Sequence, residues 1–271
     1  SGRIGRPGVK KTRGRIRNSR ILSTFVPRKA VCRRTYSAQT ARRPDPRDRR
    51  PDIVERILSA VWMMMRNRIP FIYGIECAGA DLHADLLLSP PRSCASALRN
   101  NEADIALVPV AAVPSFPDIR VVTPFCIGAS RSVRTVVLVS QEPLERIETV
   151  YLDSHSLTSV RLVRILAARH WRIAPRWREL DDFSVLDAPA PRTGYLIIGD
   201  KVFEHEARFP YRYDLADAWR EMTGLPFVFA VWVARNGVPS ETTDALARSL
   251  EYGVRRIDEA IVRYGYGHKS Y

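Results

Sequence analysis

The chain has 271 residues, 45% of them hydrophobic, and a formal net charge of +14. Such a charge would ordinarily suggest a nucleic-acid partner, but 17 of the 43 basic residues and only two of the acidic ones lie within residues 1–50. The rest of the chain is close to neutral, so its charge gives no reason to expect nucleic-acid binding there, and it is long enough for one large or two small α/β units.

Residues 1–52 form a basic arm that we expect to be disordered. The arm has few apolar residues and recurrent prolines, so it cannot bury enough surface to offset its chain entropy. It is compatible with a nucleic-acid-binding tail, with a transit peptide, or with residues that are not part of the functional protein. We favour the last interpretation, because nothing in the arm is patterned for structure and the sequence starts at Ser1. No nucleic-acid partner is therefore expected.

Cysteines and apolar runs argue against two further classes of protein. The four cysteines include no C-x-x-C pair, so we expect neither a zinc site nor a disulfide framework, and a reducing cytoplasm fits. The longest early apolar run, Ile57 to Met65, is far shorter than the roughly 20 residues of a membrane-spanning helix. The sequence predicts a cytoplasmic protein without a membrane partner.

Strand-like runs alternate with helical patterns, which favours parallel sheets with crossover helices. In the first half, apolar runs at 57–61 and 71–73 mark the two ends of the first element. A short helix at 93–100, a buried strand within 103–113 and a strand at 133–140 are expected to follow. The elements expected in the second half are strands at 149–152, 195–198 and 227–234, helices after 159 and at 215–222, and a terminal amphipathic helix carrying Leu246, Leu250, Ile257 and Ile261.

Two long predicted strands, 133–140 and 227–234, lie about 90 residues apart and bracket a self-contained block. By fold-level analogy, such a pair of strands crosses between the lobes of a two-lobed binding protein. We accordingly expect lobe 1 at 53–138 and 228–271, and lobe 2 at 139–227.

The clearest local site is the segment from Asp153 to Ser159, where a strand ends and a helix begins among three or more hydroxyl side chains. Helix N-termini with free N–H groups bind carboxylates and phosphates. Ordinary N-capping is the alternative, although one Ser or Thr would suffice for it. Gly199-Asp200 and the helix start at Ser93 are weaker signals of the same kind, and for both we favour an ordinary turn or cap as the explanation from these residues alone.

A series of motifs resembles the chorismate dehydratases of menaquinone biosynthesis. The closing motif is the most informative, with Tyr213-Asp214-Leu215, then Trp219, then Thr223 to Ala230. The other matching segments, in the family's order, are 69–74, 91–95 with 102–112, 126–128 with 133–136, 152–159 and 196–201. Together they cover about residues 57–262.

This resemblance implies an α/β fold of the type 2 periplasmic-binding-protein class, with two lobes joined by two hinge-crossing strands. It implies a hydro-lyase that converts chorismate to 3-[(1-carboxyvinyl)oxy]benzoate, the first step of the futalosine route to menaquinone, as a monomer or homodimer. No metal or organic cofactor is implied. The implied catalytic residue is Asn67, and the implied substrate-binding residues are Ser93, Thr135, Ser156, Thr158, Ser159 and Asp200.

The chain departs from the family pattern at two places. Residues 62–69 replace a Ser-Tyr-x-Asn loop with a longer segment in which only Asn67 can stand in for the asparagine, and Leu157 occupies a position where arginine is common. Either the start of this chain is imperfect or this member binds without efficient turnover. The alternative function is therefore a catalytically weak solute-binding or sensor protein for a small aromatic carboxylate.

Overall fold

The computed structural model describes residues 55–60, 69–82, 84–89, 91–153 and 156–264. The predicted arm, the candidate catalytic residue Asn67 and the last residues of the chain lie outside these ranges. Among the described residues, no helix combines the length and apolar character needed to cross a lipid bilayer.

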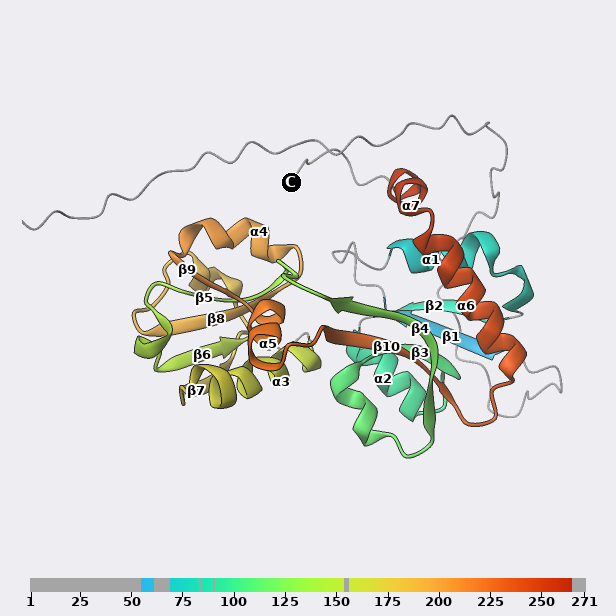
Figure 1. Cartoon of the computed structure of the whole chain (residues 1–271), viewed down its shortest axis with the longest axis horizontal. Helices are drawn as coiled ribbons and strands as arrows, with labels where there is room; N and C mark the ends of the chain where they lie inside the picture. Colours follow the sequence, from blue (N-terminus) through green and yellow to red (C-terminus); the bar gives the residue numbers. More distant parts are fainter. Residues whose placement is uncertain (1–54, 61–68, 83, 90, 154–155, 265–271) are drawn as a thin grey trace, which may run out of the picture. The chain divides into compact units, whose positions relative to one another are not determined.

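The first of two five-stranded sheets has the strand order β2-β1-β3-β10-β4 (Figure 1). Strands β1, β2 and β3 run parallel, β10 is antiparallel to β3, and β4 is antiparallel to β10. The strands are β1 Glu55–Ala60, β2 Ala84–Ser89, β3 Ile105–Pro109, β4 Ile119–Ala129 and β10 Phe227–Arg235.

The second sheet has the order β7-β6-β8-β5-β9 and repeats this plan of three parallel strands followed by two antiparallel ones. Its strands are β5 Val136–Ser140, β6 Thr149–Leu152, β7 Arg176–Glu179, β8 Thr193–Ile198 and β9 Tyr211–Asp214.

Helices cover both faces of each sheet. The α-helices are α1 Ile69–Ala78, α2 Pro91–Arg99, α3 Leu157–Leu166, α4 Lys201–His205, α5 Leu215–Thr223, α6 Ser240–Val254 and α7 Ile257–Arg263. Short helical turns of other types are η2 Ala80–Leu82, η3 Val110–Ser115, η4 Leu144–Arg146, η5 Ala167–Trp171, η6 Phe183–Leu186 and η7 Glu206–Arg208.

Each sheet has a hydrophobic core on each face, because its central strands carry apolar side chains on both faces. On the first sheet, α1 and α6 cover one face and α2 with η3 covers the other (Figure 1). On the second sheet, α3 and α5 cover one face and α4 with η6 covers the other (Figure 1). This layering follows the predicted alternation of strands and helices.

The β4–β10 pair connects the two sheets. Ile127 of β4 packs against a core of each sheet, and Phe229 of β10 is buried in the core that α3 and α5 cover. The predicted strand at 227–234 is thus confirmed as a connecting strand, but its expected companion at 133–140 is wrong. That segment forms β5 from Val136 onward and pairs only within the second sheet, with β8 and β9. The lobe boundaries given above stay a prediction.

Two local expectations were wrong for identifiable reasons. The strand expected from Val133 begins three residues later, because Arg134 has a positive φ of 61° and the preceding segment is a turn. The single terminal helix is broken in two, since Arg256 has φ −129° and ψ 43°, outside the helical region. After the break, Ile257 and Ile261 are 45% exposed rather than buried.

Candidate functional site

Polar groups gather at one edge of the second sheet. Strands β6 and β8 are parallel and end at Leu152 and Ile198, so the loops that follow them lie at the same edge. Strand β5 runs the opposite way and begins there, and the Gly199 N–H donates to the Thr135 carbonyl oxygen over 2.7 Å. In an α/β sheet this carboxyl edge is where ligands bind.

The loop after β6 leads into α3 through a serine cap. The Ser159 N–H donates to the Ser156 hydroxyl oxygen over 3.3 Å, and the two hydroxyl oxygens lie 3.0 Å apart. Ser156 is therefore the N-cap that the sequence allowed as an alternative, while the Ser159 hydroxyl caps no N–H of the helix. Ser156 is partly exposed, and Ser159 is 1% exposed.

Thr158 joins the two sheets. Its buried hydroxyl donates to the Phe229 carbonyl oxygen of β10 over 2.9 Å and accepts from the Ala111 N–H of η3 over 3.4 Å. One turn later, the Arg161 guanidinium donates to the Ala111 carbonyl oxygen over 2.6 Å. Because a hydroxyl has a single proton, Thr158 has none left to donate to a ligand in this conformation.

A buried ion pair lies at the same edge. The Lys201 ammonium at the start of α4 is 2.6 Å from the Asp153 carboxylate, which is fully buried just after β6. The ammonium also lies 3.8 Å from the centre of the Phe183 ring, a cation–π contact. Since 23% of the Lys201 side chain and none of the Asp153 side chain is exposed, the lysine is the member of the pair that reaches solvent at this edge.

Asp214 fixes the segment that enters β5. Its carboxylate caps α5 by accepting from the N–H groups of Ala216 and Asp217. The same carboxylate accepts from the Ser132 hydroxyl and from the Arg134 N–H, each over 2.7 Å. This explains part of the Tyr-Asp-Leu motif in structural terms, because the aspartate holds the turn next to Thr135.

The structure brings most, but not all, of the predicted site residues together. Those at the edge of the second sheet are Thr135, Ser156, Thr158, Ser159 and Asp200. Asp200 is half-buried and directly precedes α4. Ser93 lies instead on α2 of the first sheet, where it is exposed. Asn67 lies outside the described residues.

The sequence did not predict that Asp153 and Lys201 form an ion pair. Both residues were visible in the sequence, one directly after a strand and the other after Gly199-Asp200. The signal that would have paired them is topological. Residues that follow neighbouring parallel strands meet at one edge of the sheet, but the sequence alone did not show that β6 and β8 are neighbours.

A family model described as menaquinone biosynthesis matches residues 63–268 of the chain. The chain belongs to this family. A chorismate dehydratase from Thermus thermophilus is 29% identical over 154 residues. The aligned region covers 50% of this chain and 56% of that protein, so the chain spans little more than half the length of the relative.

Solved structures support the fold. Protein AF1704 from Archaeoglobus fulgidus matches with a TM-score of 0.59 and 15% identity, covering 79% of this chain and 83% of that one. The CA3427 gene product of Candida albicans, whose fold is described as that of generic periplasmic binding proteins, matches with a TM-score of 0.54 and 11% identity over 80% and 77% of the two chains. The predicted fold class and family are confirmed.

Proposed function

We propose that this chain is a cytoplasmic chorismate dehydratase that removes water from chorismate to give 3-[(1-carboxyvinyl)oxy]benzoate, the opening reaction of the futalosine route to menaquinone. The observation that carries the proposal is the family match over residues 63–268. The 29% identity to a chorismate dehydratase supports it, as does the collection of hydroxyls and the partly exposed Lys201 at one edge of the second sheet.

The edge of the second sheet suits a dianionic substrate. In our proposal Ser159, with the N-terminal N–H groups of α3, holds one carboxylate, and Lys201 supplies positive charge nearby. Asp153 keeps the lysine in place and moderates its charge. We also retain Thr135, Ser156 and Asp200 as substrate-binding residues on this side, as the family resemblance implies.

The remaining assignments concern the other side of the substrate and the positioning of α3. We retain Ser93 as a substrate-binding residue and Asn67 as the catalytic residue, as the family resemblance implies. For Thr158 we propose a positioning role, because its hydroxyl proton is already donated to the Phe229 carbonyl oxygen. It would hold the start of α3 in place, so that the neighbouring Ser159 meets the carboxylate.

The chemistry asks little of the protein beyond orientation. A proton leaves one ring carbon and the hydroxyl group leaves its neighbour, so water forms and the ring becomes aromatic. The driving force thus lies in the substrate, and the substrate's own enolpyruvyl carboxylate can accept the proton. The protein would orient the dianion and exclude bulk water.

The direct experiment is incubation of the purified chain with chorismate while the carboxyvinyloxy-benzoate product is followed by chromatography. We expect product to accumulate well above the uncatalysed background. If the protein is folded, as judged by a cooperative melting transition, and no such excess appears, the proposed activity is wrong.

A second candidate function is binding without turnover, as in a sensor for a small aromatic carboxylate. The departures at 62–69 and at Leu157 favour it. In that case chorismate at 100 times its dissociation constant would stabilise the folded chain by about 2.7 kcal/mol while no product formed. A rise in melting temperature with turnover would favour the enzyme instead.

A further inference from the structure

Strand β7 leaves one side of the second sheet open. It is the last strand in the order β7-β6-β8-β5-β9, and β6 is its one neighbour among the described strands (Figure 1). The N–H groups of Arg176 and Leu180 donate to carbonyl oxygens on the β6 side over 2.8 and 2.9 Å. Because backbone groups alternate in direction along a strand, those of Trp177 and Glu179 point out of the sheet. Within the described residues, no backbone group outside the β6–β7 ladder bonds them.

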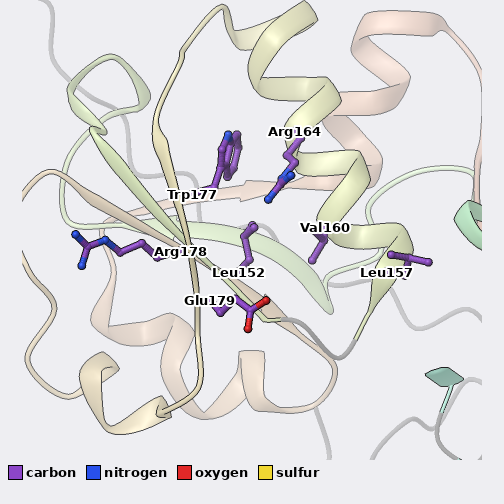
Figure 2. Close-up of a pocket in the computed structure, with 7 residues that line it drawn as sticks. All are labelled: Leu152, Leu157, Val160, Arg164, Trp177, Arg178 and Glu179. Carbon is purple, nitrogen blue, oxygen red and sulfur yellow. The ribbon is translucent and has the colours of Figure 1, made fainter. Parts of the chain in front are cut away.

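The side chains of β7 alternate between the two faces of the sheet. Trp177 packs against the core that α3 and α5 cover, and Glu179 lies on this same α3 face. Arg176 and Arg178 lie on the other face, since Arg178 pairs with Tyr151, whose ring packs against the core under α4 and η6. Figure 2 shows Arg178 directed away from α3, whereas the Trp177 ring reaches toward Arg164 of that helix.

Arg176 and Arg178 carry two charges that no acidic residue pairs with in the described part of the chain. Both side chains are exposed, and neither forms an ion pair there. The two arginines are two positions apart, which is the spacing of side chains on one face of any strand. Acidic residues at alternate positions of an added strand would therefore lie opposite both arginines.

The α3 face of β7 offers apolar contacts instead. A pocket of about 300 Å³ lies between α3 and β7 (Figure 2). The apolar side chains that line it are Leu152, Leu157, Val160 and Trp177. The Arg164 guanidinium lies 5.3 Å from the centre of the Trp177 ring, and Glu179 is on the same face, so this face has no excess of either charge. Apolar side chains of an added strand would lie beside Trp177 here.

We propose that the open edge of β7 binds an extended segment of another protein in which acidic residues alternate with apolar ones. The segment adds to the sheet as a further strand, antiparallel to β7, and its backbone bonds to that of Trp177 and Glu179. Its acidic side chains lie opposite Arg176 and Arg178, and its apolar side chains lie on the α3 face. The inference does not depend on the proposed dehydratase activity.

Two other occupants fit this edge less well. A second copy of the chain, paired antiparallel about a two-fold axis, would keep like faces together. In the two registers that pair three of the four residues of β7, Arg178 would then oppose Arg176 or Arg178 of that copy, and like charges directly opposite are destabilising. The chain's own arm carries 17 basic and two acidic residues within positions 1–50, so it lacks the alternating acids.

The test uses the full chain, labelled with ¹⁵N, and the acetylated and amidated peptide Glu-Val-Glu-Val-Glu. We expect the backbone amide signals of Trp177 and Glu179 to shift saturably at roughly millimolar peptide. The charge-reversed peptide Lys-Val-Lys-Val-Lys should bind at least about tenfold more weakly. Absence of a saturable shift of these two signals up to roughly 5 mM Glu-Val-Glu-Val-Glu would overturn the proposal. It would mean that the charges on β7 only keep other chains away from the edge.

Two methylated peptides show whether backbone hydrogen bonds are responsible. In the proposed pairing the valines lie opposite Trp177 and Glu179, so their N–H groups face β7 and those of the glutamates face away. Methylating the two valine nitrogens should weaken binding at least about tenfold, because it removes two hydrogen bonds. Methylating two glutamate nitrogens keeps the same charge and side chains and should change affinity less than about threefold. Equal affinities of the two methylated peptides would contradict strand addition.

A charge reversal tests the two arginines. Arg176→Glu combined with Arg178→Glu should weaken binding of the glutamate peptide at least about tenfold and strengthen binding of the lysine peptide by a similar factor. Arg131→Glu combined with Arg248→Glu reverses two exposed charges outside β7 and should change either affinity less than about threefold at about 0.15 M salt, where separated charges are screened. Equal effects of the two double variants would mean general attraction to a basic surface and would overturn the proposal.

Discussion

The two sheets share a strand plan and have hydrophobic cores on both faces, but they differ in the close contacts made by the segments around them. Over the first sheet, helices α1 and α6 pack backbone against backbone, because Gly74 of α1 and Gly253 of α6 have no side chain to keep them apart. In the second sheet, buried polar groups bind one another at the carboxyl edge, as in the Asp153–Lys201 pair. The same strand topology thus carries tightly packed helices on the first sheet and a cluster of polar side chains at the carboxyl edge of the second.

The largest effect should come from the backbone contact of the first sheet. A methyl group at Gly253 would overlap the Pro70 carbonyl oxygen, which cannot move without displacing α1. Gly253→Ala should therefore lower the free energy of unfolding by at least about 3 kcal/mol. Urea denaturation measures it, with Gly237→Ala as a control, where the added methyl meets open space and only the positive φ of 96° opposes it. Similar losses in both variants would contradict the close-contact explanation.

Breaking the ion pair of the second sheet should have the next largest effect. Lys201→Met leaves the fully buried Asp153 carboxylate without its cation, which should cost about 3 kcal/mol of stability. The matched control is Arg192→Met, which breaks the exposed pair with Glu148 and should cost less than about 1 kcal/mol. Chemical denaturation of both variants at pH 7 tests this difference. Equal losses of stability would show that the buried Asp153–Lys201 pair contributes no more than an exposed ion pair does.

Removing the Thr158 hydroxyl should have an intermediate effect on stability. Thr158→Val keeps the volume but leaves the Phe229 carbonyl oxygen without this donor, at a cost of about 1–3 kcal/mol. Thr158→Ser keeps the hydroxyl and should recover most of the loss. Thermal denaturation of the two variants is the measurement. If serine is no better than valine, the bond between α3 and β10 contributes little.

The smallest expected effect separates the cap from the proposed ligand contact. Ser156→Ala removes the N-cap of α3 and should lower stability by about 1 kcal/mol. Ser159→Ala removes a hydroxyl that caps no helix N–H and should change stability by less than that. Denaturation curves of the two variants decide the point. The reverse order would make Ser159 the structural residue and weaken its assignment to the site.

Much of the fold was predictable because its signals are local. The Val- and aromatic-rich run at 227–234 predicted β10, and Gly224, with a φ of 75°, ends α5 as expected of a C-cap glycine. Strand β4 was not predicted, because Pro124 interrupts its apolar pattern. Its pairing with β10 depends on partners about 100 residues away, which no local pattern encodes.

The candidate site was predictable in part for the same reason. The hydroxyl-rich segment before α3 is contiguous, so the sequence showed it directly. The roles within that segment were not visible, because they depend on distant partners. The Thr158 hydroxyl donates to the Phe229 carbonyl oxygen, and the Asp153 carboxylate accepts from the Lys201 ammonium. The positions of Ser93 on the first sheet and of the other residues on the second likewise depend on topology.

The most direct test of the central claim compares the rate of chorismate dehydration by the unmodified chain and by Ser159→Ala. Proton NMR of chorismate and product gives kcat/KM for both, at a temperature where both are folded. We predict turnover by the unmodified chain and a loss of about tenfold to a hundredfold in the variant, as expected for a lost hydrogen bond to a charged group. Equal rates in the two proteins, or no turnover by the folded unmodified chain, would contradict the claim that this edge of the second sheet is a dehydratase site.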